Sequence, residues 1–170
     1  LGLPLARQEN DWHRLGLVLP RGNMARWIIR CSQEWLEPVY WAIHARLMEC
    51  AILHMDETRI QCNKEDGKKA SSQSFMWVIR SAADEEVRAA FFYYSRTRNG
   101  DVAKDLLKRF SGYLVTDAYS GYEKVENITR SLCWSHVRRK FLDSIPLDGK
   151  GKAIPGSKGA EAVGYIDLLF

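Results

Sequence analysis

The sequence has no apolar run long enough to cross a lipid bilayer, and its amino terminus lacks the apolar core and the cleavage site of a secretory signal. Its four cysteines are widely spaced and include no Cys-x-x-Cys pair, which excludes a disulfide framework and a structural zinc ribbon. Hydrophobic residues make up 46% and charged residues 27% of the chain, which is the balance of a folded protein. We therefore expect a cytoplasmic globular protein with no membrane segment.

The chain of 170 residues carries a net charge of +4, so nucleic acid is a permitted partner but not a required one. The local distribution of charge is more informative. Between residues 128 and 158, seven basic side chains stand against two acidic ones. This segment is the strongest candidate for contacts with phosphate groups.

Residues 1–49 have the pattern of a helical extension. Apolar side chains recur at helical spacing and form one stripe, which contains Met24, Trp27, Ile28, Cys31, Trp35 and Leu36. Pro38 predicts a break, followed by a second helix to about residue 48. Two interpretations remain open, because a basic helix after a turn can bind DNA, whereas an amphipathic helix more commonly packs its apolar stripe against the protein.

Residues 50–170 alternate between strand and helix patterns. Residues 50–61, 75–81 and 87–94 predict three antiparallel strands. A helix over 101–110, a strand over 113–117, a strand over 130–134 and a helix after residue 156 follow. This order is that of the ribonuclease H-like fold, an α/β fold in which a mixed sheet carries flanking helices. We therefore expect a helical extension over 1–49 and a ribonuclease H-like core over 50–170.

Two aspartates end strand-like runs, Asp56 in the first predicted strand and Asp117 in the fourth. In the ribonuclease H-like fold these two strands lie side by side, so the two carboxylates are expected to be neighbours. Successive residues of a strand project to opposite faces, so Glu57 should point away from Asp56. We interpret Glu57 as the partner of a basic residue or as a surface charge, and not as a ligand of the same metal pair.

Residues 133–141 combine a cysteine, a histidine and a basic run. Cys133 and His136 lack a second Cys/His pair, so a structural zinc site is not expected, and His136 should support the site or contact phosphate. Arg138, Arg139 and Lys140 form either a clamp for DNA phosphates or a solvated helix face.

Three of these segments, in this order, resemble successive blocks of the insertion sequence 66 family of bacterial transposases. They are His54–Thr58, Asp117–Tyr122 and Cys133–Phe141, and residues 3–9 resemble the segment that precedes the catalytic core of that family. The resemblance covers nearly the whole chain. It implies an Asp-Asp-Glu transposase that cleaves DNA at the ends of a mobile element and joins those ends to target DNA.

The resemblance also implies the cofactors and ligands. Two Mg²⁺ or Mn²⁺ ions would be bound, with Asp56 contacting both ions and Asp117 contacting one. His136, Arg138, Arg139 and Lys140 would bind DNA. Transposases of this kind act as multimers on paired ends, so the resemblance implies a homodimer or a larger multimer.

The third acid of the family follows an apolar stretch like that of residues 165–170, beyond the end of the sequence. Neither Glu161 nor Asp167 matches its position. We therefore expect a fragment whose core is truncated at its last helix. Two alternatives to the transposase interpretation remain, an inactive DNA-binding remnant and another ribonuclease H-like nuclease.

Overall fold

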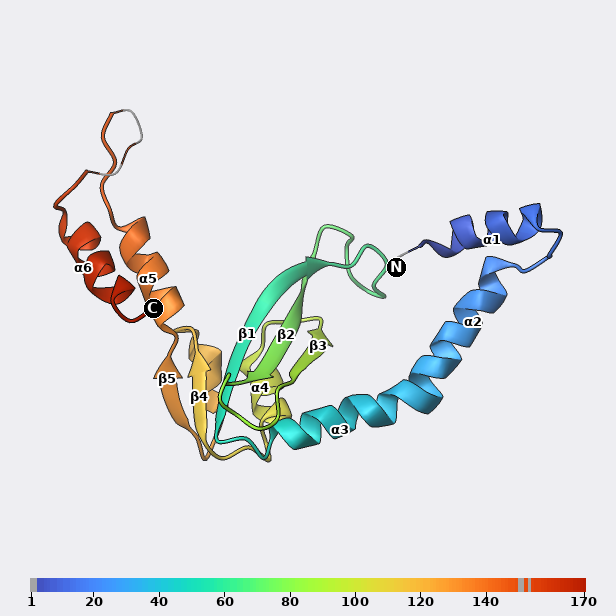
Figure 1. Ribbon diagram of the computed structural model, residues 1–170, viewed down its shortest axis with the longest axis horizontal. Coiled ribbons are helices and arrows are strands. Elements are labelled where there is room, and N and C mark those ends of the chain that lie inside the picture. The colour runs from blue at the N-terminus through green and yellow to red at the C-terminus, as the bar shows by residue number, and fades with distance from the viewer. Residues whose placement is uncertain (1–2, 150–151, 153) are drawn as a thin grey trace. The chain divides into compact units, whose positions relative to one another are not determined.

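The computed structural model describes residues 3–149, 152 and 154–170, and it divides into two compact units between Ala45 and Arg46. The first unit holds α1 (Leu5–Arg14), α2 (Arg21–Cys31), the π-helical η1 (Ser32–Leu36) and most of α3 (Glu37–Leu47). Figure 1 labels the three α-helices. The boundary expected between residues 49 and 50 lies just after α3, whereas the two units divide within the last turn of that helix.

The interruption expected at Pro38 takes the form of the π-helical segment η1, which runs directly into α3. A wide π-helical turn accommodates a residue that cannot continue the regular hydrogen-bond ladder, so the chain remains helical. Within the apolar stripe of this region, Met24 is buried, whereas Trp27, Trp35 and Leu36 are exposed. These exposures leave both interpretations of the extension open.

The second unit contains a five-stranded sheet in the order β3-β2-β1-β4-β5. Its strands are β1 (Ile52–Gln61), β2 (Gln73–Ser81), β3 (Ala90–Ser95), β4 (Tyr113–Thr116) and β5 (Thr129–Leu132). The first three strands are antiparallel, whereas β4 and β5 run parallel to β1. The helices are α4 (Gly100–Leu106), the 3₁₀-helix η2 (Ser120–Lys124), α5 (Trp134–Asp143) and α6 (Lys158–Asp167). The mixed sheet and flanking helices confirm the expected ribonuclease H-like fold.

One face of the sheet carries the core. Leu53 and Met55 project from β1 and are buried, as are their neighbours Trp77, Ile79, Phe91 and Leu114 on the adjoining strands. Tyr122 of η2 packs on this face, with its ring centroid 6.0 Å from that of Trp77 in an edge-to-face arrangement. Glu57 follows Leu53 and Met55 at the same two-residue spacing, so the strand directs its side chain toward the core.

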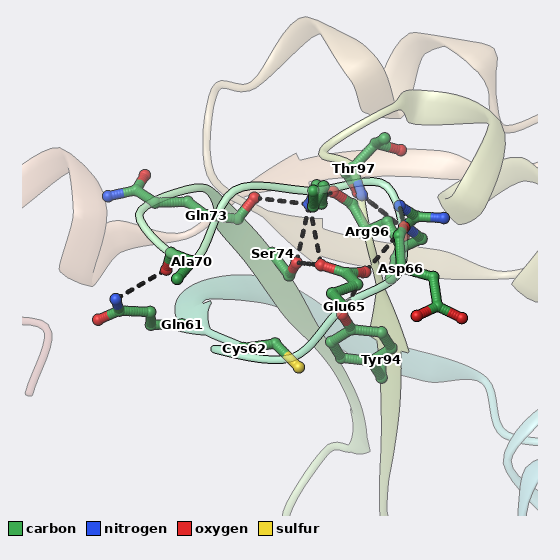
Figure 2. Close-up of polar contacts among 12 residues, drawn as sticks. Gln61, Cys62, Glu65, Asp66, Ala70, Gln73, Ser74, Tyr94, Arg96 and Thr97 are labelled. Carbon is green, nitrogen blue, oxygen red and sulfur yellow. Dashed lines mark hydrogen bonds and ion pairs between the residues drawn. The ribbon is translucent and has the colours of Figure 1, made fainter.

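The connection between β1 and β2 is held against β3 by a polar cluster around Glu65 (Figure 2). The Glu65 carboxylate accepts hydrogen bonds from the Tyr94 hydroxyl at 2.6 Å and the Ser74 hydroxyl at 2.8 Å. It also lies 2.9 Å from Nε of Arg96 and 3.3 Å from Nζ of Lys68. The hydrogen bond from Tyr94, with the others, lowers the pKa of Glu65 to about 2. Because Lys68 also donates to the carbonyl of Arg96 at 2.6 Å, the cluster holds the start of the connection from β3 to α4.

No helix in the described part of the chain is long and apolar enough to cross a membrane. Lys150, one of the basic residues counted between residues 128 and 158, lies outside the described residues.

Candidate metal centre and nucleic-acid interface

The register of the parallel strands β1 and β4 brings the two aspartates together. Leu53 pairs with Leu114 and His54 pairs with Val115, an offset of 115 − 54 = 61 residues. Asp56 and Asp117 differ by the same number, 117 − 56 = 61, so continuing the ladder by two residues places them opposite each other. Carboxylate oxygens of Asp56, Glu57 and Asp117 lie within 4.8 Å of one another. The structure therefore brings together the two acids selected from the sequence, and the carboxylate of Glu57 also reaches this cluster, although the residue was expected to point away from Asp56.

Each aspartate has one oxygen held by a backbone amide and the other directed toward a side chain. Oδ1 of Asp56 accepts from the amide of Glu57 at 2.9 Å, and Oδ1 of Asp117 accepts from the amide of Tyr119 at 2.9 Å. Oδ2 of Asp56 lies 3.6 Å from Nε2 of His136, an ion pair when the imidazole is protonated. Oδ2 of Asp117 lies 3.5 Å from Nη2 of Arg98. The Asp56 side chain is 56% exposed and that of Asp117 is 21% exposed, so solutes can reach both.

Glu57 is in a different environment, since its side chain is only 1% exposed. Its partners are Arg98 and Tyr122, neither of which the sequence had linked to it. Burial, and then the hydrogen bond to Glu57, raise the pKa of Tyr122, so the hydroxyl stays protonated and donates. Although burial opposes the charged form of Arg98, the hydrogen bond and attraction of Glu57 outweigh burial and raise the pKa of the guanidinium. Glu57 therefore has a basic partner, as one of the two interpretations from the sequence expected.

Arg130 of β5 holds the backbone on either side of the Asp117 side chain. Its guanidinium donates to Oγ1 of Thr116 at 3.0 Å, to the carbonyl of Asp117 at 2.7 Å and to the carbonyl of Tyr119 at 2.9 Å. The local balance of charge had placed Arg130 in the phosphate-binding segment. The structure instead shows its donors engaged with the turn that carries Asp117.

Helix α5 lies beside the acids and carries the predicted DNA-binding residues. Arg138 donates two hydrogen bonds to Asp167 of α6, at 2.5 and 3.2 Å, so its guanidinium is engaged within the protein. Arg139 and Lys140 are exposed and line a hollow of about 550 Å³ together with Asp56 and Asp117. Nδ1 of His136 is buried and has no hydrogen-bond partner among the described residues. The acids and two exposed basic side chains thus face one shared hollow.

The donor set suits a hard divalent cation. Mg²⁺ and Mn²⁺ prefer carboxylate oxygens and retain several water ligands, which requires an open site. The exposed Asp56 meets this requirement, whereas the sulfur and imidazole ligands of a zinc site are not assembled here among the described residues. The hydrogen bond from Arg138 lowers the pKa of Asp167. The structure thus gives Asp167 an ion-pair partner on α5.

Comparison with known proteins identifies the family. The chain matches the family described as Transposase IS66 family over residues 1–168. It is 28% identical over 167 residues to the uncharacterized protein y4jD of Sinorhizobium fredii (strain NBRC 101917 / NGR234), a match that covers 89% of this chain and 32% of the relative. The uncharacterized protein y4hP of the same organism is 30% identical over 182 residues, which covers 98% of this chain and 33% of the relative. The chain therefore spans about a third of the length of these relatives.

Among solved structures, the Drosophila P element transposase strand transfer complex is similar to this chain, with 15% sequence identity and a TM-score of 0.41. The match covers 87% of this chain and 43% of the chain in that complex. This likeness is distant. The family match covers nearly the whole sequence and includes both aspartates of the parallel strands. The chain belongs to the IS66 family of transposases.

Proposed function

We propose that this chain supplies two metal-binding carboxylates for DNA strand cleavage and strand transfer at the ends of a mobile element. One observation carries the proposal, the shared offset of 61 residues between the β1–β4 ladder and the pair Asp56 and Asp117. Membership of a transposase family supports DNA as the substrate. Because the chain spans about a third of its relatives, the activity is proposed for the site as a part of such a protein.

The described residues have distinct roles in this proposal. Asp56, the more exposed acid, would bind both cations, and Asp117 would bind one. When bound, Mg²⁺ or Mn²⁺ would activate the attacking water or 3′-hydroxyl and would stabilise the negative charge on the attacking and leaving oxygens of an in-line displacement. Arg139 and Lys140 line the same hollow and bind the phosphates that flank the scissile bond. His136, whose Nε2 lies 3.6 Å from Oδ2 of Asp56, lines the same hollow and would contact phosphate there.

Arg138 contributes differently from its neighbours on α5. Its two hydrogen bonds to Asp167 join α5 to α6, so it orients the helix that presents Arg139 and Lys140. A direct contact of Arg138 with phosphate requires this ion pair to open. Assembly into a dimer or a larger multimer on paired ends is a further part of the proposal, and light scattering with and without DNA measures it.

The test measures cleavage of DNA that carries the element ends, by a protein that contains this chain, in the presence of Mg²⁺ or Mn²⁺. Asp56→Asn and Asp117→Asn should each abolish cleavage while retaining DNA binding in a mobility-shift assay, because the substitution removes a ligand charge and preserves shape. Asp143→Asn is the matched control, since Asp143 lines the same hollow but is not one of the three clustered acids. Equal cleavage by wild type and Asp56→Asn refutes the metal role.

The same assay separates the two alternative functions. A wild-type protein that contains this chain and binds the element ends, but never cleaves them at any concentration of either cation, is a DNA-binding remnant. Cleavage that is independent of the element-end sequence and is not followed by joining identifies another ribonuclease H-like nuclease.

A further inference from the structure

Glu57 differs from the two aspartates because both of its oxygens are already occupied. Nε and Nη2 of Arg98 each lie 2.5 Å from Oε1, and the Tyr122 hydroxyl donates to Oε2 at 2.6 Å. A buried carboxylate requires such partners, because an isolated charge is strongly disfavoured away from water. To bind a cation, Glu57 would have to release Arg98 and leave a guanidinium without its main partner.

Arg98 extends from this buried ion pair to the metal centre. The nitrogen Nη2 that contacts Glu57 also lies 3.5 Å from Oδ2 of Asp117. The guanidinium carbon lies over the Tyr119 ring, 4.1 Å from its centroid, and the Tyr119 hydroxyl donates to the carbonyl of Arg98. The amide of Tyr119 in turn donates to Oδ1 of Asp117. Both oxygens of Asp117 are therefore oriented, one by this amide and the other by the arginine.

We propose that Arg98 is a positioning residue that fixes the Asp117 carboxylate for cation binding, and that Glu57 holds Arg98 in place and does not itself bind the cation. This inference rests on the proposed function, since it assumes that Asp117 is a ligand. It assigns the three clustered acids to two roles. Asp56 and Asp117 bind the cation, whereas Glu57 provides the buried negative charge beneath them.

A comparison of Mg²⁺ with Ca²⁺ isolates the positioning role from simple charge. Both ions carry two charges, so the removal of a nearby positive charge affects their affinities equally. Mg²⁺ requires nearly ideal octahedral geometry, whereas Ca²⁺ accepts irregular geometry. A loosely held Asp117 should therefore weaken Mg²⁺ binding more than Ca²⁺ binding. The ratio of the Kd for Mg²⁺ to the Kd for Ca²⁺ therefore reports how well the ligands are positioned for octahedral coordination.

The experiment uses the full chain and measures the displacement of bound Mn²⁺ by Mg²⁺ or Ca²⁺, with free Mn²⁺ detected by electron paramagnetic resonance. Arg98→Met should raise the Mg²⁺/Ca²⁺ Kd ratio about fivefold or more, because it removes the group that orients Asp117. Arg59→Met is the matched control, because Arg59 lines the same hollow and its substitution removes the same charge. The Mg²⁺/Ca²⁺ Kd ratio of this variant should stay within about twofold of wild type.

The role of Glu57 has a separate readout. Asp117→Asn should raise the Kd for both ions by about tenfold or more, as expected for the loss of a ligand. Glu57→Gln preserves shape and keeps one acceptor oxygen for Arg98, but its amide nitrogen cannot accept the hydrogen bond from Tyr122, so it should lower the thermal midpoint and change either Kd far less than Asp117→Asn does. A rise in both Kd values as large as that of Asp117→Asn shows instead that Glu57 is a ligand and overturns this part of the inference.

The double variant Arg98→Met with Glu57→Gln serves as a control for folding. Arg98→Met leaves Glu57 buried without its cation, and Glu57→Gln removes that charge, so the double variant should regain thermal stability relative to Arg98→Met alone. Its Mg²⁺/Ca²⁺ ratio should remain raised. An unchanged ratio in a folded variant that lacks Arg98 refutes the positioning role. Asp117→Asn binding both ions like wild type instead refutes the proposed function, so the two failures are distinguishable.

Discussion

The three hydrogen bonds of Arg130 predict a large and specific loss of stability when this side chain is removed. Hydrogen bonds from a charged donor contribute about 1.5–3 kcal/mol each, but bonds that share one guanidinium are not additive and this side chain is only partly buried. We therefore expect Arg130→Ala to lower the free energy of unfolding by about 2–4 kcal/mol. For a chain of this size, that corresponds to a fall of roughly 4–16 °C in the thermal midpoint.

Urea denaturation followed by far-ultraviolet circular dichroism measures this change. Arg130→Lys should lose most of the same stability, because one ammonium group cannot reproduce the planar fork that reaches two carbonyls and a hydroxyl. Arg139→Ala is the control, since Arg139 is an exposed arginine on α5, and it should stay within about 0.5 kcal/mol of wild type. Equal stability of Arg130→Ala and wild type would show that the turn carrying Asp117 does not depend on this arginine.

Three further predictions concern DNA binding, acid stability and packing. Replacing Arg139 and Lys140 together with alanine should weaken DNA binding and reduce the slope of log K against log salt by about 0.9 for each phosphate that the variant no longer neutralises; an unchanged slope contradicts the proposed phosphate binding. The pKa of Glu65 falls from its ordinary 4.5 to about 2, because a tyrosine hydroxyl and further side chains hydrogen-bond to its ionised form. The stability that Glu65 contributes is therefore complete above about pH 4.5 and is lost as the pH falls toward 2. Glu65→Gln should reduce the change of the thermal midpoint with pH over that range. Gly121→Ala should destabilise the fold by about 1–3 kcal/mol in urea denaturation, because the added methyl group overlaps an adjacent tyrosine ring, whereas Gly149→Ala meets no atom within 4 Å and should be neutral.

The order of the elements was predictable because the sequence changes its hydrophobic period at each boundary. The alternating run at residues 52–61 and the short run at 113–116 became the adjacent parallel strands β1 and β4. That adjacency follows from the order of strands in the fold, so the convergence of Asp56 and Asp117 was also predictable. The third strand begins at Ala90 and not at Val87, since the acidic turn before it extends further than its composition indicates.

The residues that support the site were not predictable to the same degree. Arg98 lies in a short polar connection before α4, where no periodicity marks one arginine as different from its neighbours. Tyr119 and Tyr122 follow Asp117 in a short aromatic segment, and only the fold shows that their hydroxyls donate to the carbonyl of Arg98 and to Glu57. Arg130 was one basic charge among several. Such roles depend on interactions between residues distant in sequence, which net charge and spacing do not encode.

The ladder between β1 and β4 also has a thermodynamic consequence. Two acids 61 positions apart have no reason to meet in an unfolded chain, so any cation that needs both of them binds only the folded sheet. Occupancy and folding are then linked, and a cation present at 100 times its Kd would raise the unfolding free energy by about 2.7 kcal/mol. Heat denaturation of this unit should therefore become a measure of cation concentration.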